Sequence, residues 1–157
     1  MLLPIKISPL TWSDYSACRF MFEDVFNIDT LQYFWTDWKS RSEKHSYIAK
    51  YMDAVVGFVL VDDTQNTIQY ICVHQDFQKQ RIGTLLLEKV LDSMSDERSI
   101  HLLTAGDKRL ATWYEKHGFQ ITKNYYEGGY VGSDMVRRQR CRSSRSSTSL
   151  SQNQQQA

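Results

Sequence analysis

Apolar and polar residues alternate along several short stretches in the first half of the chain, which is the pattern of half-buried β-strands. PIKIS at residues 4–8 predicts a first strand, and SYIAKYM, AVVGFVLVDD and TIQYICVH predict three consecutive strands further on. Turn residues separate these three, with Asp53 in the first gap and residues 62–66 in the second. Because the gaps are short, we expect an antiparallel meander.

Apolar residues spaced three and four positions apart predict helices between these strands and after them. Thr11 and Asp14 have the spacing of a capping box, so the first helix is expected to run from there to about Phe26. An aromatic-rich helix follows from Asp29. The later predicted elements are a long helix over Ile82–Met94, a strand over SIHLLTA, a helix over Lys108–His117, and closing strands around Ile121 and Met135.

The stretch VHQDFQKQRIGTLLL, from Val73 to Leu87, carries the clearest functional signal. An apolar strand ends, a glutamine-rich turn with one glycine follows, and an amphipathic helix begins. Glycine permits close backbone approach, and the first turn of a helix presents unpaired N–H groups and a partial positive charge. Such a turn predicts phosphate binding, to which Lys79 and Arg81 can add charge.

A second motif, DKRLATWYEKHGF, is a helix pattern that closes on a glycine in the C-cap position. Together the two motifs resemble the signatures of the GCN5-related N-acetyltransferases. The family's cofactor loop reads Gln or Arg, two residues, Gly, one residue, Gly or Ala; here it runs from Gln78 to Gly83, with Arg81 in the place of the first glycine. In the second signature Tyr114 precedes a charged pair and Gly-Phe, and Asp107 holds the place of an Asn.

The resemblance spans about Ile5 to Val136 and implies an α/β (α+β) fold. A single domain is expected, with a mixed, mostly antiparallel sheet of about seven strands and about four helices on both faces. It also implies acetyl-CoA as co-substrate. The residues implied to bind acetyl-CoA are Ile71, Cys72 and Val73 along the pantetheine arm, Gln78, Lys79, Gln80, Arg81, Ile82, Gly83 and Thr84 around the pyrophosphate, and Asp107.

Tyr114 resembles the family's general acid. A phenol with a pKa near ~10 stays protonated at neutral pH and can protonate the departing sulfur. The general base stays open, because histone-type members place a Glu and aralkylamine-type members a His early in the strand that here reads Thr67 to Tyr70, where neither occurs. A water relay to His45, Asp62, Glu23 or Asp24 would serve, but their spacing does not select among them.

Two further segments resemble peptide and protein N-terminal acetyltransferases. VFNIDTLQYFW matches a bend that lines the acceptor, which makes Phe26, Asn27 and Ile28 candidate substrate-binding residues; the aromatics that follow, Phe34 and Trp35, fit a helix core equally well. In KNYYEGG, Tyr125 and Tyr126 resemble the paired tyrosines that hold the acceptor's backbone in those enzymes, so they are candidate substrate-binding residues as well. The acceptor is therefore expected to be a peptide or protein amine, or a small cationic amine drawn by Glu23, Asp24, Asp29 and Asp37. The alternative is a non-catalytic acetyl-CoA-binding or partner-docking module.

Composition limits the remaining possibilities. The 157 residues are 41% hydrophobic, which suits one domain with a substantial core. Cys18, Cys72 and Cys141 lack metal-ligand spacing, so no metal is expected. The chain contains no sustained apolar run of the ~20 residues that a membrane span needs, so we expect a soluble, cytoplasmic protein without a membrane partner.

Charge divides the chain into two predicted regions. Residues 1–136, the predicted acetyltransferase domain, hold 14 basic and 18 acidic residues, a net charge of −4, whereas residues 137–157 hold five arginines and no acid. This Arg/Ser/Gln-rich tail is too poor in apolar residues to fold and is predicted to be disordered. Its RRQRCR run could contact an acidic or nucleic-acid partner weakly, although a solvated basic tail is the simpler interpretation.

Overall fold

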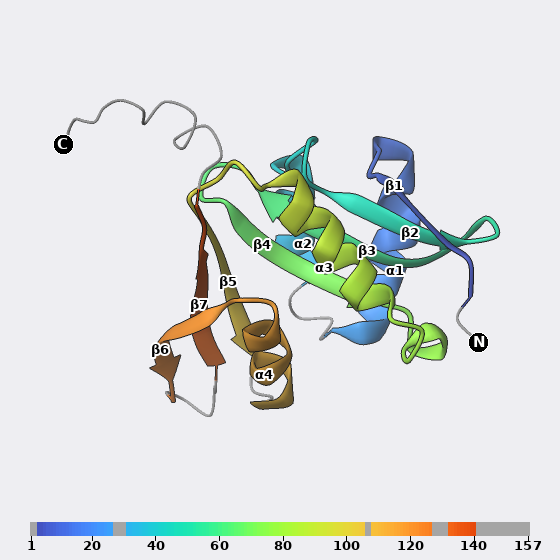
Figure 1. The fold of residues 1–157 in the computed structure, drawn as a ribbon. Helices are drawn as coiled ribbons and strands as arrows, with labels where there is room; N and C mark the ends of the chain where they lie inside the picture. Colours follow the sequence, from blue (N-terminus) through green and yellow to red (C-terminus); the bar gives the residue numbers. More distant parts are fainter. Residues whose placement is uncertain (1–2, 27–30, 106–107, 127–131, 141–157) are drawn as a thin grey trace. The chain divides into compact units, whose positions relative to one another are not determined.

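The computed structural model describes residues 3–26, 31–105, 108–126 and 132–140. The chain divides into two compact units, Met1–Ser93 and Met94–Ala157. The described residues form seven strands and four α-helices, in the order predicted from the sequence, so the α/β fold class is confirmed (Figure 1). Asp29, where the second helix was predicted to begin, lies outside the described residues.

The first unit is built on four antiparallel strands in sequence order. They are β1 (Ile5–Pro9), β2 (Tyr47–Tyr51), β3 (Ala54–Asp62) and β4 (Thr67–Val73). The last three form the predicted meander. The β3–β4 register shifts by one residue, because Leu60 pairs with Tyr70 and the next residue, Val61, pairs with Ile68. Gln69 is therefore the extra residue of a β-bulge.

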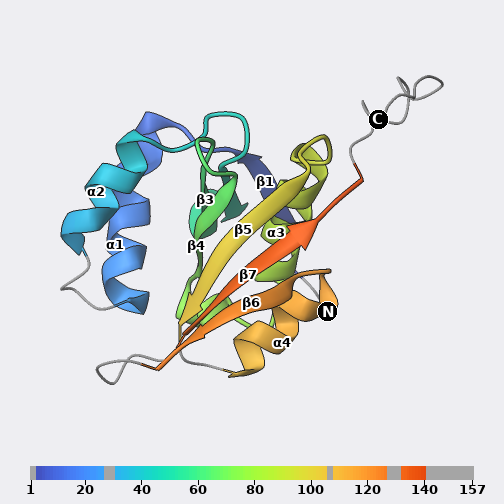
Figure 2. The ribbon, with the colours of Figure 1, turned by 90° about the vertical axis from the view of Figure 1, so that its left-hand side faces the viewer.

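Helices cover both faces of these strands (Figure 2). Helices α1 (Tyr15–Val25) and α2 (Leu31–Lys39) pack on one face, and α3 (Ile82–Ser93) packs on the other. Two neighbouring residues of β3 show the division, because successive side chains of a strand point to opposite faces. The Phe58 ring lies 5.9 Å from the Phe34 ring of α2, whereas a methyl group at Gly57 would meet the side chain of Ile82, in α3, at 3.1 Å.

The face under α1 and α2 is packed largely with aromatic rings. Phe34 is fully buried at the centre, with its ring 4.6 Å from that of Phe22 and 6.0 Å from that of Tyr15. Burying such rings contributes most of the hydrophobic stabilisation on this side of the sheet. The buried residues of this aromatic cluster are Leu10, Cys18, Met21, Phe22, Phe34, Trp38, Ile48, Phe58, Leu60 and Cys72.

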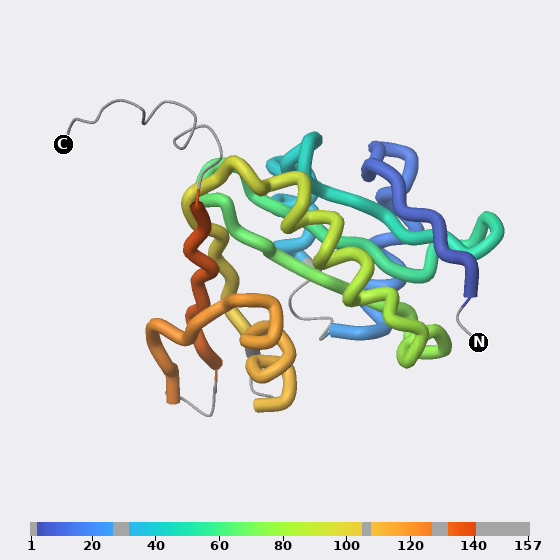
Figure 3. Tube along the Cα trace, viewed as in Figure 1, coloured from blue at the N-terminus to red at the C-terminus, as the bar shows by residue number. Residues whose placement is uncertain are grey.

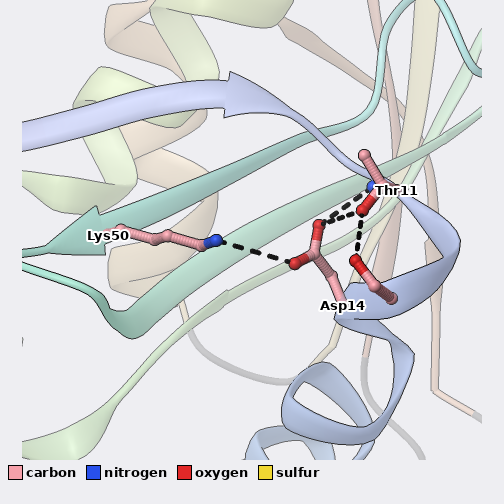
Figure 4. Close-up of polar contacts among 4 residues, drawn as sticks. Thr11, Asp14 and Lys50 are labelled. Carbon is pink, nitrogen blue, oxygen red and sulfur yellow. Dashed lines mark hydrogen bonds and ion pairs between the residues drawn. The ribbon is translucent and has the colours of Figure 1, made fainter.

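A polar network fixes the entry to α1 (Figure 4). A 3₁₀ turn, Trp12–Asp14, precedes the helix, and the backbone N–H of Thr11 donates to Asp14 Oδ2 at 2.9 Å. Lys50 of β2 places its Nζ 3.8 Å from the other carboxylate oxygen of Asp14. The Thr11 and Asp14 pairing is the one predicted from the sequence, and it ties the start of α1 to the strands.

The second unit contains β5 (Ser99–Ala105), α4 (Lys108–Lys116), β6 (Gln120–Tyr125) and β7 (Gly132–Arg138). Strand β7 lies between β5 and β6 and is antiparallel to both. Arg137 and Arg138, the first two residues of the predicted tail, pair with Ile100 and Ser99 and so belong to a strand. The predicted disorder of the tail lies outside the described residues from residue 141 onward.

Within the described part of the chain, no helix has both the length and the apolar character that crossing a bilayer requires. The cytoplasmic location expected from the sequence stays a prediction.

Candidate functional site

The predicted phosphate-binding turn connects β4 to α3 (Figure 3). After Val73 the chain makes a 3₁₀ turn over Gln75–Phe77, held by the Phe77 N–H, which donates to the His74 carbonyl at 2.9 Å. Helix α3 then begins at Ile82, and its first intrahelical hydrogen bond runs from Leu85 N–H to the Arg81 carbonyl at 3.0 Å. The N–H groups that precede Leu85 in the first helical turn have no helical acceptor and can bind an anion.

The backbone of this turn is left-handed at two residues that are not glycine. Lys79 has a φ of 69° and Arg81 a φ of 62°. This region of backbone space is open to glycine, whereas a residue with a side chain pays roughly 1–2 kcal/mol there. Arg81 therefore keeps the backbone conformation that a glycine in its place would adopt easily, and it adds an exposed guanidinium group.

The side chains of the predicted cofactor residues in this turn have different environments. Gln78 and the two left-handed residues are exposed, and Gln78 Nε2 donates to the Val73 carbonyl at 3.3 Å. Gln80 is half-buried, and its Oε1 accepts from the Leu3 N–H at 3.3 Å. Ile82 is buried at the base of α3, so only its backbone is free to face a ligand.

Strand β4 supplies the three residues predicted along the pantetheine arm, Ile71, Cys72 and Val73, which pair with Val59, Phe58 and Gly57 of β3. Cys72 is almost fully buried against α1, and its thiol lies 3.9 Å from the Met21 carbonyl. Burial, with a smaller effect of the Asp24 charge, raises the pKa of this thiol from 9.0 to about 12. Cys72 can therefore offer a ligand its backbone groups but not a thiolate.

Tyr114, the predicted general acid, lies in α4 of the second unit with 7% of its surface exposed. Its ring packs edge-on against Phe119 at 5.7 Å, and its carbonyl accepts from the N–H groups of His117 and Phe119 at the end of the helix. Burial raises the pKa of the hydroxyl well above its ordinary value. The phenol is therefore protonated at neutral pH, as a general acid must be.

The predicted acceptor residues are described only in part. Asn27 and Ile28, and the predicted cofactor residue Asp107, lie outside the described residues. Phe26 follows α1, is 38% exposed, and packs its ring 4.8 Å from that of Phe22. The two tyrosines differ: the Tyr125 hydroxyl donates to Asp134 of β7, whereas Tyr126 is 73% exposed.

The four residues considered as a general base have other partners or are exposed. His45 Nδ1 lies 2.8 Å from the Ser93 hydroxyl, and Asp62 accepts from the Thr64 N–H at 2.8 Å within a turn. Glu23 pairs with Arg19 at 3.3 Å along α1, and Asp24 is exposed. The contacts of these four side chains therefore do not identify any of them as the general base.

Sequence reasoning missed a pairing between α2 and β4. The hydroxyl of Tyr70 donates to Asp37 Oδ2 at 2.6 Å. Burial of the phenol and this hydrogen bond raise the pKa of Tyr70. The alternation of β4 was visible in the sequence, but nothing in it indicated a partner 33 residues away. Among the described residues, no group of His, Cys, Asp and Glu side chains could hold a metal ion.

Comparison with known families identifies the class of protein that this fold and turn define. The model of the "Acetyltransferase (GNAT) domain" family matches residues 42–121, which include the whole of the β4–α3 turn and Tyr114. The match covers half of the chain, so the chain belongs to the GNAT acetyltransferase family. The resemblance predicted from the two sequence motifs is confirmed.

Solved structures share the fold at low sequence identity. Naa50 from Arabidopsis thaliana, in complex with the bisubstrate analogue CoA-Ac-MVNAL, is 18% identical with a TM-score of 0.73, over 85% of this chain and 97% of that chain. Ard1 from Thermoplasma volcanium is 19% identical with a TM-score of 0.74, over 86% and 97%. The ribosomal-protein-S18-alanine N-acetyltransferase from Escherichia coli is 18% identical with a TM-score of 0.73, over 86% and 94%. Among curated proteins, none matches this chain significantly.

Proposed function

We propose that this protein transfers the acetyl group of acetyl-CoA to an amine by direct attack of the amine nitrogen on the thioester. The observation that carries the proposal is the β4–α3 turn, where a helix start presents unpaired N–H groups beside a left-handed backbone at Arg81. This is the environment that a pyrophosphate needs. The exposed side chains of Lys79 and Arg81 add two positive charges to it.

The proposed roles follow from the local chemistry of each unit. The turn from Gln78 to Thr84 binds the pyrophosphate, and the backbone of Ile71 to Val73 binds the pantetheine arm and the thioester oxygen. Tyr114, protonated because it is buried, donates a proton to the leaving sulfur. Asp107 and the acceptor residues Phe26, Asn27, Ile28, Tyr125 and Tyr126 stay predictions.

A peptide or protein amine is the favoured acceptor, and a small cationic amine is the second. Naa50 was solved with a bisubstrate analogue carrying the peptide MVNAL, and the NatC complex was solved with Gag peptide and CoA. These neighbours support a peptide acceptor for a chain of the same fold. The two acceptor classes differ in one respect that is easily measured, namely whether a peptide backbone must flank the reacting nitrogen.

Transfer of isotope-labelled acetyl groups to a panel of peptides, polyamines and arylamines tests the proposal. We expect transfer to at least one peptide. Tyr114→Phe should lower turnover by roughly 100-fold or more while acetyl-CoA affinity stays unchanged. Tyr47→Phe is the matched control, because Tyr47 is also 7% exposed and its hydroxyl donates to the Lys44 carbonyl at 3.1 Å. Binding of acetyl-CoA without transfer to any amine would overturn the enzyme assignment and leave a binding module.

A further inference from the structure

The pairing of Tyr70 with Asp37 places a carboxylate beside the strand that the proposed function assigns to the thioester. Tyr70 immediately precedes Ile71, the first of the three residues proposed to bind the pantetheine arm. Its hydroxyl reaches Asp37 Oδ2 of α2 at 2.6 Å, and both side chains are partly buried. Within the described residues, the Asp37 carboxylate accepts this hydrogen bond at Oδ2. Its other oxygen, Oδ1, can accept a hydrogen bond or a proton from a ligand.

Aromatic rings surround the Tyr70 end of this pair. Phe22 lies 5.0 Å from the Tyr70 ring, and Phe26 and Phe34 each lie 6.0 Å from it. These rings lower the local dielectric, so a hydrogen bond to the carboxylate is stronger here than in water. Phe22 and Phe34 are buried, so Phe26, at 38% exposed, is the ring of the three that can attract an ammonium group. Phe26, which the sequence placed at the acceptor bend, is the most exposed of the three.

The charges on this face are predominantly negative. The negative charge of Asp37 helps to raise the pKa of Tyr70. The charge of Asp24, in α1, does the same for the pKa of Cys72, two residues further along β4. On α1, Arg19 pairs with Glu23, and on α2 Lys39 lies over the Trp35 ring at 5.4 Å. The cations of the two helices are thus engaged elsewhere, and a carboxylate is presented beside β4.

We propose that Asp37 is the base that receives the proton of the acceptor amine, and that Tyr70 is the positioning residue that orients its carboxylate. The inference rests on the proposed acetyl transfer. The neutral amine nitrogen forms a bond to the thioester carbonyl carbon and becomes cationic and acidic. Asp37 Oδ1 takes one of its protons, the carbon–sulfur bond breaks, and the sulfur leaves as the free thiol with the proton that Tyr114, the proposed general acid, donates. Asp37 then releases its proton to solvent and Tyr114 takes one from solvent, so the net products are the amide and the free thiol.

This assignment explains why the base was absent from the positions that the family resemblance suggested. The start of β4 holds no acid or histidine, so a carboxylate for the acceptor must come from another element. Helix α2 provides one, and Tyr70 holds it by donating to one oxygen. The other oxygen keeps its lone pairs for the amine, which is the arrangement that general base catalysis requires.

Asp37→Asn tests the inference, because the amide oxygen can still accept from the Tyr70 hydroxyl but cannot take a proton at neutral pH. We expect kcat for the best acceptor in the labelled panel to fall about 100-fold or more, with KM and acetyl-CoA affinity within about twofold of the wild type. Asp63→Asn is the matched control, since it makes the same change at an exposed aspartate in the turn between β3 and β4. It should leave kcat unchanged.

Derivatives of the best acceptor, with stepwise fluorine substitution next to the reacting nitrogen, distinguish a base from a structural residue. Fluorine makes the attacking nitrogen more acidic, so the reaction depends less on a base. The kcat defect of Asp37→Asn should therefore shrink along the series, whereas a general loss of structure would lower all rates equally. Tyr70→Phe should lower kcat roughly tenfold, because the carboxylate loses its orientation but keeps its charge.

Two outcomes separate this inference from the proposed function. If the wild type transfers label and Asp37→Asn transfers it at the same rate, Asp37 is not the base while acetyl transfer stands. An Asp37→Asn defect of constant size along the fluorinated series would overturn the inference as well. If the wild type transfers label to no amine, the proposed function itself fails.

Discussion

The two faces of the first-unit sheet meet their helices in different ways. On the α3 face the backbone of β3 comes close to the helix at Gly57, so that a methyl group there would lie 3.0 to 3.2 Å from Cys72, Ile82 and Leu86. On the α1 and α2 face the space is filled by stacked aromatic rings around Phe34. The close face positions backbone groups at the start of α3, whereas the aromatic face positions side chains, including Asp37 and Tyr70. Cofactor binding and acceptor chemistry are therefore expected to respond to different mutations.

Phe34→Ala is expected to have the largest effect on stability. Phe34 is fully buried and its ring lies within 6.0 Å of five others, those of Tyr15, Phe22, Trp38, Phe58 and Tyr70. Removing it should lower the free energy of unfolding by about 3–5 kcal/mol, measured by urea denaturation. The β4–α3 turn leads into α3, which packs on the opposite face of the strands. The acetyl-CoA affinity of the folded fraction should therefore stay within about threefold of the wild-type value. A larger loss of affinity would contradict the division between the two faces.

Gly57→Ala is expected to have a smaller effect on stability and a larger effect on the cofactor. The added methyl group meets the Cys72 carbonyl oxygen at 3.0 Å, and a backbone atom cannot move aside as a flexible side chain can. The side chains of Ile82 and Leu86 in α3 lie 3.1 and 3.2 Å from the same methyl group and must also give way, at a cost of about 1–3 kcal/mol in unfolding free energy. Because Ile82 begins that helix, the turn moves with it, and calorimetric titration should show weaker acetyl-CoA binding.

Ala54→Gly serves as the control for Gly57→Ala, since it changes a side chain of the same strand that is exposed at its start. It should leave acetyl-CoA affinity unaltered. Equal affinities for wild type and Gly57→Ala would show that the close contact with α3 does not position the turn.

Arg81→Gly should have the smallest effect on stability, and in the opposite direction. Glycine relieves the left-handed backbone at φ 62°, and the gain is partly offset by the greater entropy of the unfolded chain. The free energy of unfolding should rise by about 0.5–1 kcal/mol. Acetyl-CoA affinity should fall if the guanidinium binds phosphate, and this fall should diminish at high salt. Lys79→Gly is the matched variant, because Lys79 has a similar left-handed φ of 69° and its replacement should raise the free energy of unfolding by a similar amount.

The sequence was sufficient to predict the elements because their periods are regular. The alternation over residues 54–63 and the helical spacing over Ile82–Met94 reappear as β3 and α3 with boundaries shifted by at most one residue. The turn between β4 and α3 was predicted because the glycine and the helix start lie next to each other in sequence; its binding of phosphate stays a prediction. Its left-handed residues were not predicted, since the side chains of Lys79 and Arg81 disfavour that conformation.

The proposed acceptor side of the site was harder to predict, because it depends on tertiary packing. Asp37 and Tyr70 are brought together by the packing of α2 on the strands, and nothing local in either segment signals the other. The bulge at Gln69 adds to the difficulty. Strict alternation would put Ile68 and Tyr70 on one face, but they pair with Val61 and Leu60, which are adjacent in β3 and face opposite sides.

The bulge also makes β4 tolerant of one particular change in chain length. Deleting Gln69 would leave a continuous ladder with β3, in which Ile68 still pairs with Val61 and Tyr70 still pairs with Leu60. Because paired residues of neighbouring strands share a face, no side chain of β4 would turn over, and Tyr70 would still face Asp37. Deleting a residue from the regular part of the strand would instead move every side chain on one side of the deletion to the opposite face.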